Sequence, residues 1–172
     1  MPEIEWEYPT LAPYQAEWIN DPHRFKAIEG ATGTGKTFVW EPFLFMRSHS
    51  PKKRGAEFWW ISPTIDQARA VFDNIVRQIE DAGVVTHYGG NVSLREIETP
   101  GGGILCFKTG EKPGNLYGIR NVEEIIVDEF TRTRIELWAA LLSVANKTGC
   151  NITFIGNYTG DDSAWHLWTK TM

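Results

Sequence analysis

The chain has 172 residues, enough for one globular domain that buries a core without disulfides or bound metals. Hydrophobic residues make up 42% of the sequence and charged residues 23%, proportions that exclude a disordered, collagen-like or membrane-embedded protein. The net charge of −5 excludes a protein that grips nucleic acid over its whole surface, because phosphate contacts depend on lysine and arginine. Any contact with DNA must therefore be local or transient, or lie on another domain.

The sequence carries no signal for export or membrane insertion. No apolar run is long enough to span a bilayer, and the acidic start, with Glu3, Glu5 and Glu7, lacks the basic residues of a secretory signal. We therefore expect a cytosolic location without membrane contact. Cys106 and Cys150 each lie in an apolar stretch, which predicts reduced thiols in the core. The four histidines are scattered without a two-ligand cluster, so no zinc site is expected.

Apolar residues recur along the chain with strand and helix periods in turn. Short apolar runs bounded by glycine, proline or acidic residues predict strands, and longer stretches with apolar residues three and four apart predict helices. In chain order the patterns predict strands at 25–29, 57–62, 92–98, 104–108, 124–128 and 151–155, and helices at 38–48, 65–79 and 135–144.

Three of these elements carry a more specific expectation. Pro42 lies inside the first helix and predicts a bend, because proline removes a backbone hydrogen bond. The strand at 57–62 is too apolar to be half exposed and predicts a sheet covered on both faces. The strands at 92–98 and 104–108 flank a glycine-rich loop and predict a hairpin.

The alternation of strands and helices predicts an α/β fold with a mainly parallel sheet, helices on both faces and a β-hairpin insert. We interpret residues 1–172 as one domain, with an N-terminal segment at 1–24 and a core at 25–172. In such a fold, ligands bind at the carboxyl ends of the strands. Two motifs fall at such ends.

The first motif is a complete phosphate-binding loop after the strand at 25–29. Glycines in such a loop let successive backbone N–H groups and the helix N-terminus face phosphate oxygens. Lys36 is expected to lie against the β- and γ-phosphates, and the Thr37 hydroxyl is expected to be a ligand of Mg²⁺. The alternative is a glycine-rich turn that binds no nucleotide. The motif reads Gly30-Ala31-Thr32-Gly33-Thr34-Gly35-Lys36-Thr37 and satisfies every fixed position of the phosphate-loop pattern.

The second motif consists of two acids that follow the apolar strand at 124–128. Asp128 is expected to hold Mg²⁺ through water or the Thr37 hydroxyl, and Glu129 to orient and polarise the attacking water. The alternative is an ordinary acidic turn after a core strand. Together with the phosphate loop, the two acids predict a P-loop NTPase of the ASCE type that hydrolyses MgATP.

Adenosine recognition is predicted from the segment before the first strand. Tyr14 is placed to stack on the base and Gln15 to hydrogen-bond to its edge, and no guanine-reading motif is present. The alternative is a hydrophobic staple that packs the N-terminal segment on the core.

The order of the motifs resembles the ATPase domain of the large terminase subunit, the DNA-packaging motor of tailed bacteriophages. The resemblance covers most of residues 11–168, and its middle stretch is the part that distinguishes terminases from other P-loop proteins. The segments that carry it are Tyr14-Gln15, Gly30 to Thr37, Trp60-Ile61-Ser62-Pro63-Thr64 with Gln67-Ala68, Gly102-Gly103-Ile104-Leu105-Cys106-Phe107, Pro113-Gly114-Asn115-Leu116-Tyr117-Gly118-Ile119-Arg120, Asp128-Glu129 and Phe154-Ile155-Gly156-Asn157.

The resemblance implies roles for two further residues. Asn157 is expected to sense the nucleotide state and couple hydrolysis to movement; the alternative is that it caps the end of its strand. Such motors place an arginine at the γ-phosphate in the transition state. Arg120 is the candidate, from the same or a neighbouring subunit, and its alternative is an ion pair with an acid such as Glu123. Arg132 and Arg134 compete for the arginine role.

The resemblance also implies partners and a location. It predicts a homo-oligomeric ring on a portal that translocates double-stranded DNA into a procapsid, with a small terminase subunit as a further partner, in the host cell cytoplasm. Complete large terminases continue into a ribonuclease-H-like nuclease domain. The sequence contains no such domain, so no nuclease function is expected.

Two other functions fit the same motifs. A superfamily 2 helicase core shares the Tyr-Gln pair, the phosphate loop and an acidic pair. Against it, Asp128-Glu129-Phe130-Thr131 departs from the Asp-Glu-Ala-Asp/His patterns usual in helicases, and there is no second motor domain. A nucleotide-dependent assembly switch would bind ATP and hardly hydrolyse it.

Overall fold

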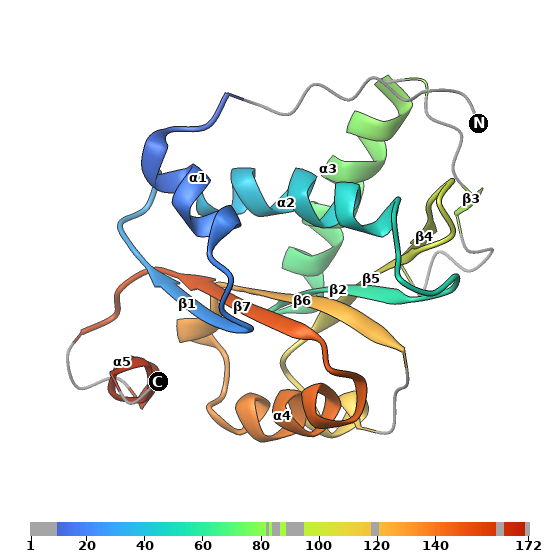
Figure 1. Ribbon diagram of the computed structural model, residues 1–172. Helices are drawn as coiled ribbons and strands as arrows, with labels where there is room; N and C mark the ends of the chain where they lie inside the picture. The colour runs from blue at the N-terminus through green and yellow to red at the C-terminus, as the bar shows by residue number, and fades with distance from the viewer. Residues whose placement is uncertain are drawn as a thin grey trace.

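The computed structural model describes residues 10–81, 83, 87–88, 95–117, 121–160 and 164–170. These residues form a seven-stranded sheet with helices on both faces (Figure 1). The strands are β1 Phe25–Glu29, β2 Glu57–Ser62, β3 His87–Tyr88, β4 Glu96–Glu98, β5 Ile104–Thr109, β6 Val122–Asp128 and β7 Asn151–Gly156. The helices are α1 Pro13–Asn20, α2 Lys36–Ser48, α3 Ile65–Asp81, α4 Glu136–Thr148 and α5 Ala164–Thr169, with short 3₁₀ helices η1 Pro113–Leu116 and η2 Phe130–Arg132.

The sheet has the order β1-β7-β6-β2-β5-β4-β3. The first five strands in this order run parallel, and β4 and β3 are added antiparallel at the edge. The predicted mainly parallel α/β fold with a hairpin is therefore confirmed. The hairpin joins β4 to β5, and the part of the predicted strand at residues 92–94 lies outside the described residues.

The alternation of side chains along β2 builds two separate cores. Trp59 and Ile61 lie in one cluster with α4, whereas Phe58 and Trp60 lie in the other with α2 and α3. All four side chains are fully buried. This is the strand covered on both faces that the continuous apolar run predicts, and Figure 1 shows α1, α2 and α3 on one side of the sheet and α4 on the other.

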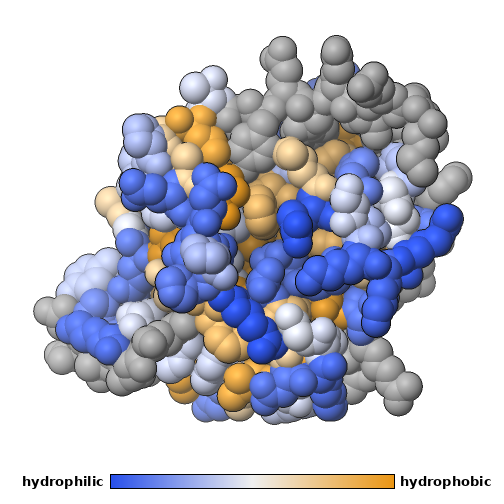
Figure 2. All heavy atoms as spheres, viewed as in Figure 1, coloured by the Kyte–Doolittle hydropathy of each residue, from blue (hydrophilic) through white to orange (hydrophobic). Residues whose placement is uncertain are grey.

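Polar residues cover most of the surface in the view of Figure 2, and hydrophobic atoms show mainly in the recesses between the helices and the sheet. Both cysteines are free and buried, as predicted. No helix among the described residues is long and apolar enough to cross a membrane.

The three predicted helices differ from the structure mainly at their ends, and α1 was not predicted. α2 begins at Lys36 and continues through Pro42 to Ser48, and α4 extends to Thr148, where Gly149 adopts a left-handed conformation and ends it. α3 ends at Asp81, two residues before Gly83, which is also left-handed. The 3₁₀ helices and α5 are too short to leave a periodic signal in the sequence.

The register of the parallel strands decides where the functional residues lie. Glu29 at the end of β1 pairs with Gly156, and Asp128 at the end of β6 pairs with Ile155 of β7. The carboxyl ends of β1, β7 and β6 are therefore level with one another. The segments that follow these three strands must meet at one edge of the sheet.

We predict that Phe154→Ala strongly destabilises the fold. Phe154 is fully buried in β7, and its ring lies 5.0 to 5.9 Å from the rings of Phe130, Trp138, Trp165 and Trp168. Loss of the ring leaves a cavity, and the free energy of unfolding should fall by about 3–5 kcal/mol in urea denaturation. The control is Met46→Ala at a 46% exposed position, which should change it by less than about 0.5 kcal/mol. Equal effects would show that the aromatic cluster adds little to stability.

Candidate functional site

The loop between β1 and α2 is shaped by glycines that adopt conformations other residues avoid. Gly33 and Gly35 have φ values of 86° and 76°, in the left-handed region. Gly35 is also the residue that precedes the first turn of α2. The loop therefore turns directly into a helix, whose N-terminus carries unpaired N–H groups and a partial positive charge.

Lys36 folds back over this loop. Its Nζ lies within hydrogen-bond distance of four acceptors, which share its three N–H groups: the carbonyl oxygens of Gly30 at 3.0 Å and Ala31 at 2.8 Å, Oγ1 of Thr34 at 3.1 Å and Oδ1 of Asn157 at 3.2 Å. Burial lowers the pKa of Lys36, and the charge of Asp128 opposes this effect. The ammonium thus ties the loop to the segment that follows β7.

The two acids after β6 lie beside the start of α2. Oγ1 of Thr37 donates to Oδ1 of Asp128 at 3.3 Å, and the backbone N–H of Glu129 donates to the same oxygen at 3.0 Å. Burial raises the pKa of Asp128 to about 6, and the neighbouring charge of Glu129 acts in the same direction. The hydrogen bond from Thr37 and the charge of Lys36 partly offset this rise.

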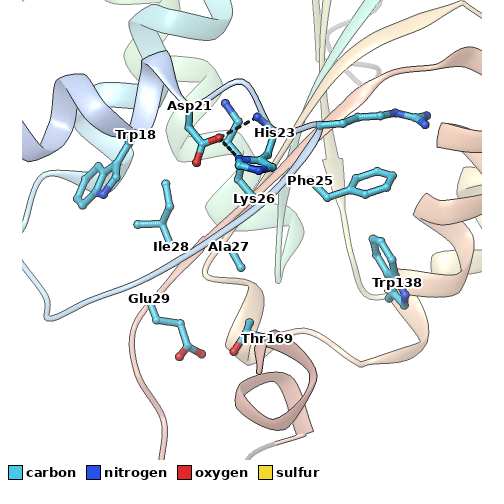
Figure 3. Close-up of a pocket in the computed structure, with 11 residues that line it drawn as sticks. Trp18, Asp21, His23, Phe25, Lys26, Ala27, Ile28, Glu29, Trp138 and Thr169 are labelled. Carbon is cyan, nitrogen blue, oxygen red and sulfur yellow. Dashed lines mark hydrogen bonds and ion pairs between the residues drawn. The ribbon is translucent and has the colours of Figure 1, made fainter. Parts of the chain in front are cut away.

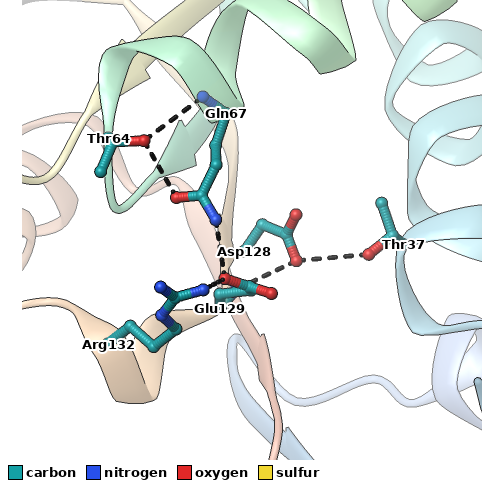
Figure 4. A network of polar contacts seen from close by, with 6 residues as sticks. All are labelled: Thr37, Thr64, Gln67, Asp128, Glu129 and Arg132. Carbon is teal, nitrogen blue, oxygen red and sulfur yellow. Dashed lines mark hydrogen bonds and ion pairs between the residues drawn. The ribbon is translucent and has the colours of Figure 1, made fainter. Parts of the chain in front are cut away.

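The carboxylate of Glu129 is held by two donors from different elements (Figure 4). Nε2 of Gln67 in α3 donates to Oε2 at 2.9 Å, and a guanidinium nitrogen of Arg132 donates to the same oxygen at 2.8 Å. Glu129 has a φ of 45°, a left-handed conformation that is uncommon for a residue with a side chain. The backbone therefore turns sharply between the two acids.

These residues surround one hollow of about 310 Å³ at the carboxyl edge of the sheet. It lies between the glycine loop, the start of α2, the acids after β6 and the segment after β7. Its lining consists of Thr32, Gly33, Gly35, Lys36, Thr37, Phe38, Asp128, Glu129, Gly156 and Asn157.

The predicted base-binding pair lies against the loop. Tyr14 Oη and Gln15 Nε2 donate to the carbonyl oxygen of Thr34 at 3.3 and 3.2 Å. Gln15 is buried, and its Oε1 accepts a hydrogen bond from the backbone N–H of Ala12 at 2.9 Å. A Cβ at Gly35 would lie 2.6 Å from Nε2 of Gln15, so a larger residue there would displace the Gln15 amide as well as strain the backbone. The pair supports the loop in this structure, and its contact with a base stays a prediction.

The arginine candidates are placed differently. Arg120 lies outside the described residues. Arg132 forms the ion pair with Glu129, whereas Arg134 is exposed. The structure therefore gives Arg132 a contact with the site that the sequence did not predict.

Sequence reasoning also missed two residues near the acids. It gave no role to Gln67, although Thr64-x-x-Gln67 after a buried strand is the signature of a capping box at a helix start. It did not consider Glu41, which is 7% exposed in α2 and accepts a hydrogen bond from Nδ2 of Asn74 at 2.7 Å. Burial raises the pKa of Glu41 to about 7, with a further contribution from the charge of Asp128. Glu41 is one helical turn beyond Thr37, so a period-based reading of α2 could have marked it as an acid on a covered face.

A second hollow, of about 770 Å³, runs along the free edge of β1 (Figure 3). Trp18 and Trp138 line it from opposite faces of the sheet, and Asp21 accepts two hydrogen bonds from His23 there. This hollow contains neither the loop glycines nor the acids. The phosphate-loop residues and the two acids after β6 line the smaller hollow instead.

The chain has a fold of the P-loop NTPase type, with a glycine loop at a helix N-terminus and an acidic strand end beside it. Among solved structures, the fold matches the ATPase domains of large terminases. The ATPase domain of the large terminase of Thermus phage P74-26 has a TM-score of 0.69 at 19% identity, over 88% of this chain and 66% of that chain. The large terminase of bacteriophage HK97 has a TM-score of 0.73 at 13% identity, over 94% of this chain and 36% of that chain.

The large terminase of a thermophilic bacteriophage, solved in complex with ADP, has a TM-score of 0.72 at 14% identity, over 92% of this chain and 41% of that chain. The chain spans only part of the length of these proteins. No family model matches the sequence, and no curated protein does. The likeness therefore shows that the predicted terminase ATPase fold is correct.

We predict that Glu41→Gln stabilises the protein more at pH 8 than at pH 5. The folded protein holds the Glu41 proton up to a pKa of about 7, whereas the ordinary pKa of a glutamate side chain is 4.5. Between pH 4.5 and about pH 7, this carboxyl binds more protons in the folded state than in the unfolded state. The free energy of unfolding therefore falls as the pH rises through this range. Glutamine keeps an acceptor for Asn74 without the charge, and the gain in unfolding free energy should be larger at pH 8 by about 2 kcal/mol.

Urea denaturation at the two pH values measures this difference. The control is Glu17→Gln at an exposed position of α1, which should show no such dependence on pH. A gain for Glu41→Gln that is the same at both pH values would contradict the raised pKa.

Proposed function

We propose that this chain is an ATP-hydrolysing motor domain of a viral DNA-packaging terminase. The observation that carries the proposal is the meeting of Lys36, Thr37, Asp128, Glu129 and Asn157 at one hollow. The fold shared with terminase ATPase domains supports it. Residues 1–172 would act as one domain, with residues 1–24 contributing to adenine recognition and residues 25–172 forming the ATPase core.

ATP would bind with its phosphates on the loop at residues 30–37. The N-terminus of α2 and the loop N–H groups favour negative charge. The Lys36 ammonium, now bonded to loop oxygens, would exchange some of these contacts for the β- and γ-phosphates. The adenine would lie by Tyr14 and Gln15. The large terminase of the thermophilic bacteriophage has been solved with ADP and with ATP-γ-S, which supports a nucleotide as the ligand.

The residues at this site also fit Mg²⁺. Thr37 and Asp128 present a hydroxyl and a carboxylate oxygen 3.3 Å apart, and hard oxygen donors of this kind are the ligands that Mg²⁺ prefers. A bound Mg²⁺ would neutralise charge on the β- and γ-phosphates. It would also favour the ionised form of Asp128, whose pKa burial raises.

Glu129 would act as the general base that orients and polarises the attacking water. It lines the same hollow as Lys36, one residue beyond the Mg²⁺ ligand Asp128. Lys36 would stabilise the charge that develops on the phosphates. Asn157 would sense the γ-phosphate, because its contact with Lys36 must change when phosphate oxygens approach that ammonium.

Packaging requires partners beyond this chain. We propose a homo-oligomeric ring on a portal that moves double-stranded DNA into a procapsid in the host cell cytoplasm, with a small terminase subunit as a further partner. Arg120 would supply the positive charge at the γ-phosphate from the same or a neighbouring subunit, with Arg132 and Arg134 as competitors.

We predict that Glu129→Gln abolishes most ATP hydrolysis and retains ATP binding. Loss of the base should lower kcat by about 100-fold or more, because general base catalysis contributes on that order. Lys36→Ala should weaken ATP binding itself. Steady-state phosphate release and equilibrium binding of ATP measure the two effects, with Glu136→Gln, an exposed acid at the start of α4, as the matched control.

Turnover should rise faster than linearly with protein concentration if a neighbouring subunit supplies the arginine, and double-stranded DNA should stimulate it. Glu129→Gln with wild-type turnover would refute the assigned base. A wild-type chain that binds no ATP would refute the whole proposal. Binding without turnover at any concentration, with or without DNA, would indicate an assembly switch, and strand separation would indicate a helicase.

A further inference from the structure

Both donors to the Glu129 carboxylate use the same oxygen. Gln67 and Arg132 bind Oε2, and among the described residues no donor binds Oε1. Figure 4 shows the second oxygen of Glu129 on the side that faces Asp128 and Thr37. Oε2 of the carboxylate is therefore held by hydrogen bonds, whereas Oε1 faces the hollow.

The orientation of the Gln67 amide is determined by its partners. Oγ1 of Thr64 accepts from the backbone N–H of Gln67 at 3.3 Å and donates to Oε1 of Gln67 at 3.1 Å. A carboxylate only accepts hydrogen bonds, so the amide must present its NH₂ group to Glu129. The hydroxyl of Thr64 stabilises this arrangement from the other side. Thr64, Gln67 and Glu129 thus form one chain of hydrogen bonds with consistent direction.

The carboxylate needs such an anchor because little else restrains it. Glu129 follows the last residue of β6 with a left-handed backbone, and its side chain is 31% exposed. A glutamate side chain that is free to rotate loses about 1–2 kcal/mol of conformational entropy when it is fixed in one position. An anchor that is already in place pre-organises the carboxylate before ATP arrives.

The two donors differ in how well they can serve as this anchor. The side chain of Arg132 is 62% exposed, so its ion pair is screened by salt and is worth little. Gln67 is half-buried in the first turn of α3, a long helix packed on the sheet, and its amide carries no charge, so its hydrogen bond to the carboxylate is less sensitive to salt than the ion pair. Gln67 therefore restrains the Glu129 carboxylate more firmly than Arg132 does.

We propose that Gln67 is a positioning residue that orients Glu129 toward the attacking water. This inference rests on the proposed function, in which Glu129 is the base. Gln67 belongs to the junction of β2 and α3, and Glu129 to the end of β6, the strand that pairs with β2. The hydrogen bond between them makes the activity of the site depend on where the start of α3 lies relative to β6.

The test compares Gln67→Met and Gln67→Glu with the wild-type chain in steady-state ATP hydrolysis. Methionine keeps the length of the side chain without the donor, and glutamate replaces the donor with a carboxylate. Both variants should lower kcat by about 10-fold or more, while KM for ATP and equilibrium ATP binding stay within about 2-fold. A structural role alone would instead lower the urea midpoint, or change KM and kcat together.

The matched controls are Gln78→Met and Gln78→Glu on the same helix. These make the same chemical changes away from Glu129 and should leave kcat unchanged. Thr64→Val removes the hydroxyl that orients the amide and should lower kcat less than Gln67→Met does.

Combination with Glu129→Gln decides whether Gln67 acts through Glu129. If it does, adding Gln67→Met to Glu129→Gln should cause no further loss of turnover. Independent, multiplying losses would overturn the inference, as would Gln67→Met with wild-type kcat when Glu129→Gln is inactive; the proposed function would survive both results. Glu129→Gln with wild-type turnover, or a wild-type chain without turnover, would overturn both.

Discussion

The buried ammonium of Lys36 lies within hydrogen-bond distance of four oxygens, three from the glycine loop and one from Asn157 after β7. A cation removed from water needs such acceptors, and burial already lowers the pKa of Lys36. The loop oxygens and the Asn157 side chain are therefore held in place by one positive charge. Under the proposed function, phosphate oxygens that compete for this charge would replace some of these contacts, so a bound nucleotide would act on Asn157 as well as on the loop.

The loop is supported from two further directions. Tyr14 and Gln15 of α1 donate to the carbonyl of Thr34, and Nδ1 of His166 in α5 lies 2.8 Å from Oε2 of Glu29, the last residue before the loop. The chain thus returns to the loop after β7 through α5.

Much of the site could be predicted because its residues are consecutive in the sequence. The phosphate loop and the acids after β6 are local patterns, and the buried strands are short continuous apolar runs whose length and flanking residues distinguish them from helices. Gln67 could not be predicted in the same way. It is 62 residues from Glu129, and the two meet only because β2 lies next to β6 in the sheet. Sheet order depends on tertiary packing, which a periodicity does not encode.

Burial opposes the charged form on the acidic side of the site, as it does at Lys36. Asp128, Glu129 and Glu41 bring carboxylates into a partly buried region, where burial raises the pKa of Asp128 and Glu41, and Glu129 adopts a strained backbone. A fold selected only for stability would avoid this arrangement, because unpaired buried charges are costly. Residues that oppose stability in this way gather where function requires them.

Each of these three acids accepts a side-chain hydrogen bond from a neighbouring helix. Thr37 donates to Asp128, Gln67 to Glu129 and Asn74 to Glu41. Since these donors lie on α2 and α3, the positions of both helices determine how well the acidic side is held.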